Sequence, residues 1–178
     1  MMTNKLNIGC GNDIKEGFVN LDITQLPGVD VVCDIENSPL PFEDNFFEYI
    51  LCTDVLEHVE YIKVLKEIYR VLKPGGIVEI RVPHFTSSNN FIDPTHKKMF
   101  SFRTFSFFAN NIKYKRNYYF DFQFSEVLYS KITFISKNPI NWPFIIWVNI
   151  NNTTRKIYEE TFFRNIAPAF NVEVQLKK

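Results

Sequence analysis

The chain has 178 residues, 46% of them hydrophobic, and its 20 Lys and Arg balance its 20 Asp and Glu. This length and composition predict one domain over residues 1–178 and exclude a disordered chain. The N-terminal residues show no cleavable apolar segment, and the apolar stretch from Trp142 to Val148 is too short to span a bilayer. We therefore expect a cytoplasmic protein.

The charges are unevenly distributed along the chain. Residues 1–96 carry 7 Lys or Arg and 15 Asp or Glu, a net charge of −8, whereas residues 97–137 carry 8 and 2, a net charge of +6. Aromatic residues gather in the second half, where 22 of the 29 lie between Phe85 and Phe170. Residues 1–84 and 85–178 are therefore predicted to have different roles within the one domain.

In the first half, short apolar runs alternate with turns. Strands are predicted at residues 6–8, 18–21, 29–33, 46–52 and 77–82. Apolar residues at three- and four-residue spacing from Ile62 to Leu72 predict a helix with one buried face, ending at Lys73-Pro74-Gly75-Gly76. Strands that alternate with helical segments predict an α/β fold with a mostly parallel sheet.

The second half gives weaker patterns. Residues 86–95 are predicted to be a loop, residues 99–110 a short helix, residues 118–124 and 127–135 strands, residues 154–165 a helix and residues 171–176 a last strand. The aromatic residues are expected mainly in the core and its cover, and we also expect the stretch from Trp142 to Trp147 to be buried, although contact with a lipid-linked substrate is the alternative.

Polar residues and glycines follow the predicted strands. They are Gly9-Cys10-Gly11, Asp22, Asp34, Thr53-Asp54 and Pro83-His84. In an open parallel sheet, ligands bind beyond the carboxyl ends of the strands. Two glycines one residue apart allow a tight turn close to a ligand, and an acid that ends the second strand can accept hydrogen bonds from ribose hydroxyls. An acid after the third strand can accept from an adenine amino group, so the pattern predicts an adenosine site.

The residues after the glycine turn narrow the choice of adenosine ligand. A dinucleotide site typically has a third glycine, but Gly11 is followed by Asn12-Asp13-Ile14. No phosphate-binding loop of the GxxxxGK type is present, and Asp13 would repel a diphosphate. The net negative charge of this half suits a cofactor with a sulfonium and an ammonium group, namely S-adenosylmethionine (SAM).

Five motifs in order carry a resemblance to a known family. They are Leu6-Asn7-Ile8-Gly9-Cys10-Gly11, Asn20-Leu21-Asp22-Ile23, Cys33-Asp34-Ile35, Phe47-Glu48-Tyr49-Ile50 with Val55-Leu56-Glu57-His58-Val59, and Leu72-Lys73-Pro74-Gly75-Gly76. Together they resemble the class I SAM-dependent methyltransferases, and within these the type-11 methyltransferase-domain group. Asp93-Pro94-Thr95-His96-Lys97 resembles, more weakly, a compact subset associated with surface-glycan gene sets.

The resemblance implies a Rossmann-like, mostly parallel sheet with an aromatic-rich C-terminal cap, and a methyltransferase (EC 2.1.1) that uses SAM. Its implied cofactor-binding residues are Gly9, Cys10 and Gly11 at the methionine part, Asp22 and Ile23 at the ribose, Asp34 and Ile35 at the adenine, Thr53 under the sulfonium, and His58 beside the cofactor. Two departures stand out: Asn7 replaces an acid common in the family, and only 11 residues separate Gly11 from Asp22. The first helix is therefore predicted to be a stub.

The substrate side offers candidate catalytic residues. His84 and His96 are the candidates for a general base, because both lie beyond the fifth predicted strand on the ligand side of the sheet and an imidazole can accept a proton near neutral pH. Lys97, Lys98 and Arg103 are candidates for holding a substrate phosphate. Ordinary roles are the alternatives, as a strand cap for His84, a turn residue for His96 and a solvated face for the basic residues. No spacing predicts a metal site.

These features predict methyl transfer to a small, anionic acceptor, with a sugar nucleotide or glycan intermediate as the first hypothesis. A SAM-binding partner or sensor module without turnover is the alternative. A nucleic-acid methyltransferase is the second alternative, for which Tyr114-Lys115-Arg116-Asn117-Tyr118-Tyr119 supplies basic and aromatic residues.

Overall fold

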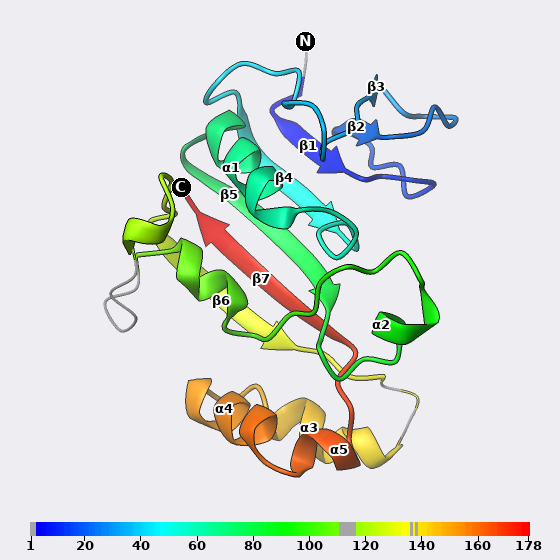
Figure 1. Cartoon of the computed structure of the whole chain (residues 1–178), viewed down its shortest axis with the longest axis vertical. Helices are drawn as coiled ribbons and strands as arrows, with labels where there is room; N and C mark the ends of the chain where they lie inside the picture. The colour runs from blue at the N-terminus through cyan, green and yellow to red at the C-terminus, as the bar shows by residue number, and fades with distance from the viewer. Residues whose placement is uncertain (1–2, 111–116, 136, 138) are drawn as a thin grey trace.

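The computed structural model describes residues 3–110, 117–135, 137 and 139–178. At its centre is a seven-stranded sheet in the order β3-β2-β1-β4-β5-β7-β6 (Figure 1). Its strands are β1 (Lys5–Ile8), β2 (Val19–Asp22), β3 (Val31–Val32), β4 (Phe47–Thr53), β5 (Leu72–Pro83), β6 (Glu126–Ile132) and β7 (Asn171–Lys177). β7 pairs antiparallel with both of its neighbours, while β3, β2, β1, β4 and β5 pair in parallel. The predicted Rossmann-like, mostly parallel fold is confirmed.

The helix α1 (Tyr61–Val71) forms where the apolar periodicity predicts it. Val64, Leu65, Ile68 and Val71 are buried, and the helix covers one face of β4 and β5 (Figure 1). The helix ends close to the predicted boundary, since the chain leaves it at Leu72, but Lys73-Pro74-Gly75-Gly76 belongs to β5 and does not cap the helix. Leu72 is extended, pairs with β4 and is fully buried.

Two buried asparagines organise the connection between β1 and β2. Residues 9–18 form turns and contain no helix, so even the predicted stub of a first helix is absent from this segment. The Nδ2 of Asn7 donates to the Oδ1 of Asn20 at 3.1 Å and to the carbonyl of Asp13 at 3.0 Å. Asn20 Oδ1 also accepts the backbone N–H of Lys15 at 2.9 Å. The departure at position 7 therefore anchors the short loop, since the amide supplies the donor that the Asp13 carbonyl needs.

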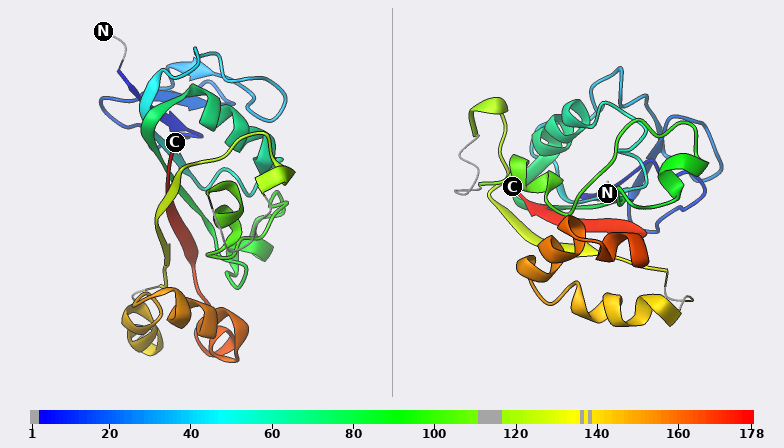
Figure 2. Two further views of the ribbon diagram at one scale, coloured as in Figure 1. Left: turned by 90° about the vertical axis from the view of Figure 1, so that its left-hand side faces the viewer. Right: turned by 60° about the horizontal axis from the view of Figure 1, so that its bottom comes forward.

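The second half departs further from the sequence patterns. Its helices are α2 (Asn89–Ile92), η1 (Thr104–Phe108), η2 (Asn117–Tyr119), η3 (Pro139–Asn141), α3 (Trp142–Trp147), α4 (Asn152–Glu160) and α5 (Phe163–Ile166). The predicted loop contains α2, the helix predicted over 154–165 is divided into α4 and α5, and the strand predicted over 118–124 is wrong. Figure 2 shows α3, α4 and α5 grouped beyond one end of β6 and β7.

Residues from both halves share one core. β5 pairs with β7 from Ile77 opposite Lys177 to Pro83 opposite Asn171. Many aromatic residues of the second half join this core, as predicted; Phe100, Phe105, Phe124 and Tyr158 are fully buried. The last strand thus closes the sheet that the first half begins.

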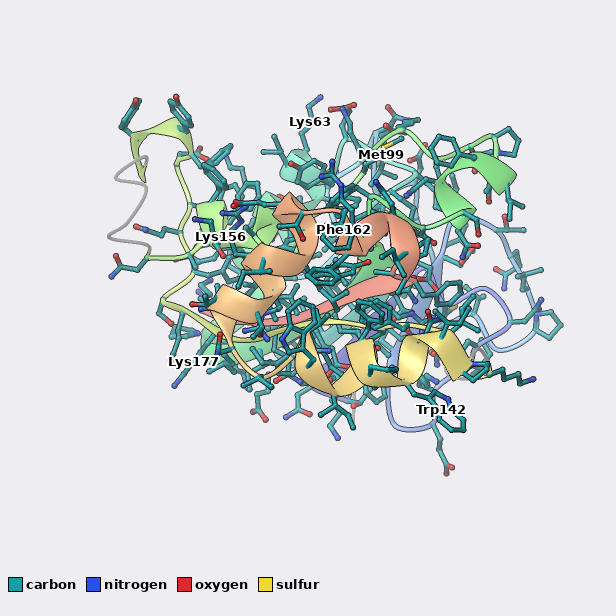
Figure 3. The ribbon with its side chains drawn as sticks, turned by 90° about the horizontal axis from the view of Figure 1, so that it is seen from below. Lys63, Met99, Trp142, Lys156, Phe162 and Lys177 are labelled. Atoms are coloured by element: carbon teal, nitrogen blue, oxygen red, sulfur yellow. The ribbon has the colours of Figure 1, made fainter. Side chains whose placement is uncertain are left out.

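Burial was expected for the helix α3, but the structure shows this helix partly exposed. Trp142 is 62% exposed and Ile146 is 76% exposed, and Figure 3 shows Trp142 at the outer end of this helix. Trp147 is half-buried, with its ring centroid 5.1 Å from that of Phe163. The helix therefore packs through one side only. No helix in the described part of the chain is long and apolar enough to cross a membrane.

Candidate active site

A pocket of about 350 Å³ opens beyond the carboxyl ends of β1, β2 and β4. Its volume lies within the range of small-molecule sites, about 300–1,000 Å³. Carboxylates and apolar side chains share its wall, which consists of Gly9, Leu21, Asp22, Ile23, Cys33, Asp34, Ile35, Glu36, Asp54, Val55, His58 and Val59. Most of the predicted cofactor-binding residues are thus brought together, and we call this cavity the adenosine pocket after the ligand that the sequence predicts.

The glycine turn borders this pocket through its first residue. Gly9 has a φ of +66°, and a Cβ at this position would lie 2.2 Å from Val55 Cγ2. Cys10 is buried beneath the turn, and its N–H donates to the carbonyl of Leu21 at 3.0 Å. Cys10 and Gly11 are not among the residues that line the pocket. Their placement gives them a structural part in the turn, and their contact with the cofactor stays a prediction.

The acids after β2 and β3 both line the pocket. Asp22 accepts the backbone N–H of Gly11 at 2.8 Å with one oxygen and that of Thr24 at 2.9 Å with the other. Asp34 accepts from the side chain of Asn37 at 2.8 Å, and this hydrogen bond lowers the pKa of its carboxyl. Asp22 therefore fastens the glycine turn to β2, whereas Asp34 caps its own turn at the rim.

The turn after β4 presents different residues from the one predicted. Thr53 does not line the pocket, but Asp54 and Val55 do. Asp54 has a φ of +55° and pairs with the guanidinium of Arg81 on β5. The positive φ turns the chain sharply after Thr53, which brings the two following residues to the pocket in its place.

A second pocket of about 290 Å³ adjoins the first and shares Asp54 and His58 with it. Carboxylates, imidazoles and one guanidinium line it: Asp54, Glu57, His58, Arg81, Pro83, Asn89, Asp93, His96, Phe170 and Asn171. We call it the acceptor pocket. His58 stands at the boundary between the two pockets, a position suited to the point where a cofactor and a second ligand meet.

Glu57 is the functional candidate that the sequence patterns did not identify. It is 1% exposed, and its Oε2 has no hydrogen-bond partner in the described structure. Burial raises the pKa of its carboxyl to about 8. The available signal was an acid and a histidine enclosed by Leu56 and Val59, a pattern that predicts a buried charge near a site.

The two histidines of the acceptor pocket lie against each other, with ring centroids 4.6 Å apart. His58 Nδ1 lies 2.8 Å from Thr95 Oγ1, and this hydroxyl donates to Asp93 Oδ1 at 2.6 Å. Because the Thr95 proton points to Asp93, Thr95 accepts from Nδ1 of His58, which leaves the lone pair on Nε2. Burial and the neighbouring His96 lower the pKa of His58.

No metal site was predicted from the spacing of residues in the sequence, but the structure brings three possible metal ligands together. Glu57, His58 and His96 can each offer one ligand atom, and these atoms lie within 4.8 Å of one another. His58 and His96 are 38 positions apart, so their spacing in the sequence gave no metal pattern. They meet because the backbone N–H of Lys97 donates to the carbonyl of Glu57 at 2.7 Å.

His84 is placed where a general base cannot work. It is fully buried and lines neither the adenosine pocket nor the acceptor pocket. Its Nε2 lies 3.0 Å from Glu159 Oε1, and its Nδ1 accepts the backbone N–H of Thr86 at 3.2 Å. Both ring nitrogens interact with other groups of the protein, so His84 has a structural role and is not available as the general base that the sequence suggested.

The basic residues expected to hold a phosphate are engaged in ion pairs. Lys97 binds Glu36 at 2.8 Å, Lys98 binds Glu60 at 3.0 Å, and Arg103 binds Glu160 at 2.7 Å. None of the three lines the acceptor pocket, and Arg103 lines a separate pocket beside β6 and α4. Lys97 and Lys98 instead tie the loop after β5 to the segments after β3 and β4.

The sheet order and the ligand pocket at the strand ends define the class I SAM-dependent methyltransferase architecture. Residues 3–80 match the model of the family described as "Methyltransferase domain". A crystal structure of a SAM-dependent methyltransferase from Archaeoglobus fulgidus superposes with a TM-score of 0.63 at 20% identity, covering 99% of this chain and 86% of that one.

Curated relatives match over shorter stretches. An uncharacterised protein of Methanocaldococcus jannaschii is 38% identical over 85 residues, which cover 46% of this chain and 38% of the relative. The demethylmenaquinone methyltransferase of Geobacillus stearothermophilus is 32% identical over 104 residues, 58% of this chain and 35% of the relative. The chain thus spans well under half the length of either relative.

The family model that residues 3–80 match and the fold together imply SAM as the cofactor, and the adenosine pocket fits it. Gly9 borders the pocket without a side chain, and a Cβ at this position would collide with Val55, which also lines the pocket. The carboxylate of Asp22 lines the pocket and could accept from ribose hydroxyls, as the sequence predicts, and Ile23 and Ile35 supply apolar surface for a nucleoside. When bound, SAM supplies the electrophilic methyl group.

Proposed function

We propose that this protein transfers a methyl group from SAM to a small molecule bound in the acceptor pocket. The observation that carries the proposal is the pair of adjoining pockets, which share Asp54 and His58 at the strand ends. Two ligands held side by side react as one complex, and orientation alone can contribute about 7–11 kcal/mol to lowering the barrier.

The charge of the acceptor pocket bears on the choice of substrate. Three acidic side chains line it, those of Asp54, Glu57 and Asp93, and its one guanidinium, Arg81, is paired with Asp54. Because burial raises the pKa of Glu57 to about 8, the negative charge near neutral pH comes mainly from Asp54 and Asp93. With the predicted phosphate-binding residues engaged elsewhere, the protein groups alone favour a neutral or cationic acceptor over the anionic sugar nucleotide first predicted. His58 and His96 also line this pocket, so either imidazole is within the space that such an acceptor would occupy.

Asp22→Asn tests the cofactor site. Removing the charge weakens the hydrogen bonds to ribose hydroxyls, and bonds to charged groups contribute about 1.5–3 kcal/mol, so affinity for S-adenosylhomocysteine should fall about 10- to 100-fold. Isothermal titration calorimetry measures this. Asp13→Asn is the matched control, because Asp13 is exposed, pairs with Lys15 and lies outside the pocket. Equal affinities for the two variants would contradict the assignment of the pocket.

Turnover is tested with SAM labelled in its methyl group and a panel of acceptors: amines, neutral polyols, quinols, sugar nucleotides and RNA. We expect transfer to a neutral or cationic small molecule. Binding of S-adenosylhomocysteine without transfer to any acceptor would favour the non-catalytic alternative. Transfer to RNA with a steep salt dependence would favour a nucleic-acid methyltransferase. Residues 114–116 of the basic aromatic segment lie outside the described residues.

A further inference from the structure

The acceptor pocket contains two buried polar atoms without partners. Glu57 Oε2 and His96 Nδ1 are both shielded from solvent and form no hydrogen bond in the described structure. A buried polar atom without a partner is costly and rare in folded proteins. Two in adjacent side chains of one pocket indicate that something absent from the polypeptide satisfies them.

The third group at this point is the free side of His58. Its Nδ1 is held by Thr95, so the Nε2 lone pair is available, and the three side chains can place their ligand atoms within 4.8 Å of one another. Ligand atoms around a four-coordinate zinc lie roughly 3.3–3.5 Å apart, because its bonds are about 2.0–2.2 Å long. Small side-chain rotations therefore suffice to close the set on one ion.

A carboxylate backs both imidazoles. Asp93 Oδ1 accepts the Thr95 hydroxyl that holds His58, and Asp93 Oδ2 lies 3.8 Å from the Nε2 of His96. Histidine ligands in metal sites typically direct their second nitrogen to such a group, which fixes the tautomer and the ring orientation. The arrangement around Asp93 places the other nitrogen of each ring, His58 Nε2 and His96 Nδ1, on the ligand side.

From these observations we propose that Glu57, His58 and His96 form a binding site for one divalent transition-metal ion, with Asp93 as the residue that positions both histidines. Two imidazoles and one carboxylate suit Zn²⁺, Co²⁺, Fe²⁺ or Mn²⁺. Three protein ligands leave a coordination position open toward the acceptor pocket. There the ion would hold and polarise an acceptor oxygen. This role rests on the proposed methyl transfer, but the existence of the metal site does not depend on that proposal.

Cobalt titration tests the site. After dialysis against EDTA, the full chain is titrated with Co²⁺, and we expect visible d–d absorption that saturates at one equivalent and disappears when Zn²⁺ is added. Glu57→Gln and His96→Gln should each abolish this signal. Asp93→Asn should weaken binding about 10- to 100-fold, as loss of a group behind a ligand does.

The matched control is Glu60→Gln. Glu60 lies three residues after Glu57, its side chain is 53% exposed, and it pairs with Lys98 outside both pockets. This variant should bind Co²⁺ like the wild type. Thermal unfolding confirms that each variant folds, and S-adenosylhomocysteine binding is measured on the same samples.

The two readouts separate the metal site from the methyltransferase proposal. A wild-type chain that binds S-adenosylhomocysteine but gives no saturable Co²⁺ spectrum would overturn the metal site and leave the proposed function standing. An undiminished spectrum in the folded Glu57→Gln and His96→Gln variants would also overturn it. A normal Co²⁺ spectrum without S-adenosylhomocysteine binding would support the metal site and count against the proposed function.

Discussion

Glu159→Ala should lower the free energy of unfolding by about 3–5 kcal/mol, the usual cost of breaking a buried hydrogen-bonded pair from one side. Glu159 is 4% exposed. Its Oε1 accepts from His84 Nε2 at 3.0 Å and from the backbone N–H of Phe102 at 2.9 Å, and its Oε2 accepts the hydroxyl of Ser101 at 2.7 Å. Alanine would leave all three donors without their acceptor beside His84, which is fully buried.

The matched control is Glu160→Ala. The side chain of Glu160 is 47% exposed and pairs with Arg103 and Lys156 at the surface. Exposed ion pairs contribute about 0–1 kcal/mol, so this variant should unfold in denaturant almost like the wild type. A similar loss of stability in both variants would mean that truncation of an acidic side chain on α4, and not loss of the buried carboxylate, causes the effect.

The same carboxylate predicts how stability depends on pH. Burial raises the pKa of Glu159, but hydrogen bonds from His84, Ser101 and Phe102 outweigh it and hold the pKa below the usual 4.5. A lowered folded pKa means that the stabilisation is fully present above pH 4.5 and is lost as the pH falls through the folded value. The difference in stability between wild type and Glu159→Gln should therefore narrow as the pH is lowered below 4.5.

Gly9→Ala is the second large effect. An alanine with left-handed backbone angles lowers the stability of the fold by about 1–2 kcal/mol, and overpacking of a rigid interior lowers it by about 1–3 kcal/mol more. The backbone at Gly9 has a φ of +66°, and the added Cβ would lie 2.2 Å from Val55 Cγ2. We expect a loss of about 2–5 kcal/mol, which lowers the Tm by roughly 4–20 °C in a chain of this size. Calorimetry of the cofactor-free protein measures it.

Two further variants separate strain from collision. Gly17 has a φ of +76° but open space around it, so Gly17→Ala should show the backbone cost alone. In a double-mutant cycle, Val55→Ala should recover most of the collision cost of Gly9→Ala. If Gly9→Ala proves no worse than Gly17→Ala, then Val55 moves aside freely and the close approach of the turn is not a tight constraint.

The cofactor half could be predicted largely from sequence because its determinants are local. Each strand end coincides with a break in an apolar run, and such breaks meet at one edge of a parallel sheet. Asp22 and Gly9 were therefore placed correctly at the pocket. Thr53 was displaced by the positive φ at Asp54, a backbone feature that residue types alone did not reveal.

The second pocket could not be predicted in this way. His84 and His96 look equivalent in sequence, yet one is paired with Glu159 in the core and the other faces Glu57 and His58. What distinguishes them is pairing between distant segments, such as the backbone bonds from Lys97 and Lys98 to the carbonyl of Glu57. In the cap, exposure of Trp142 shows that apolar composition alone does not establish burial.

The position of β7 between β5 and β6 has a consequence during translation. β6 leaves the ribosome before β7, and in the finished sheet it pairs with β7. Until residues 171–177 emerge, both β6 and the open edge of β5 lack their partner, and unpaired strands are prone to associate with other chains. Slow synthesis through the helices α3 to α5 would prolong that exposure, so their codons and the availability of chaperones should influence the yield of folded protein.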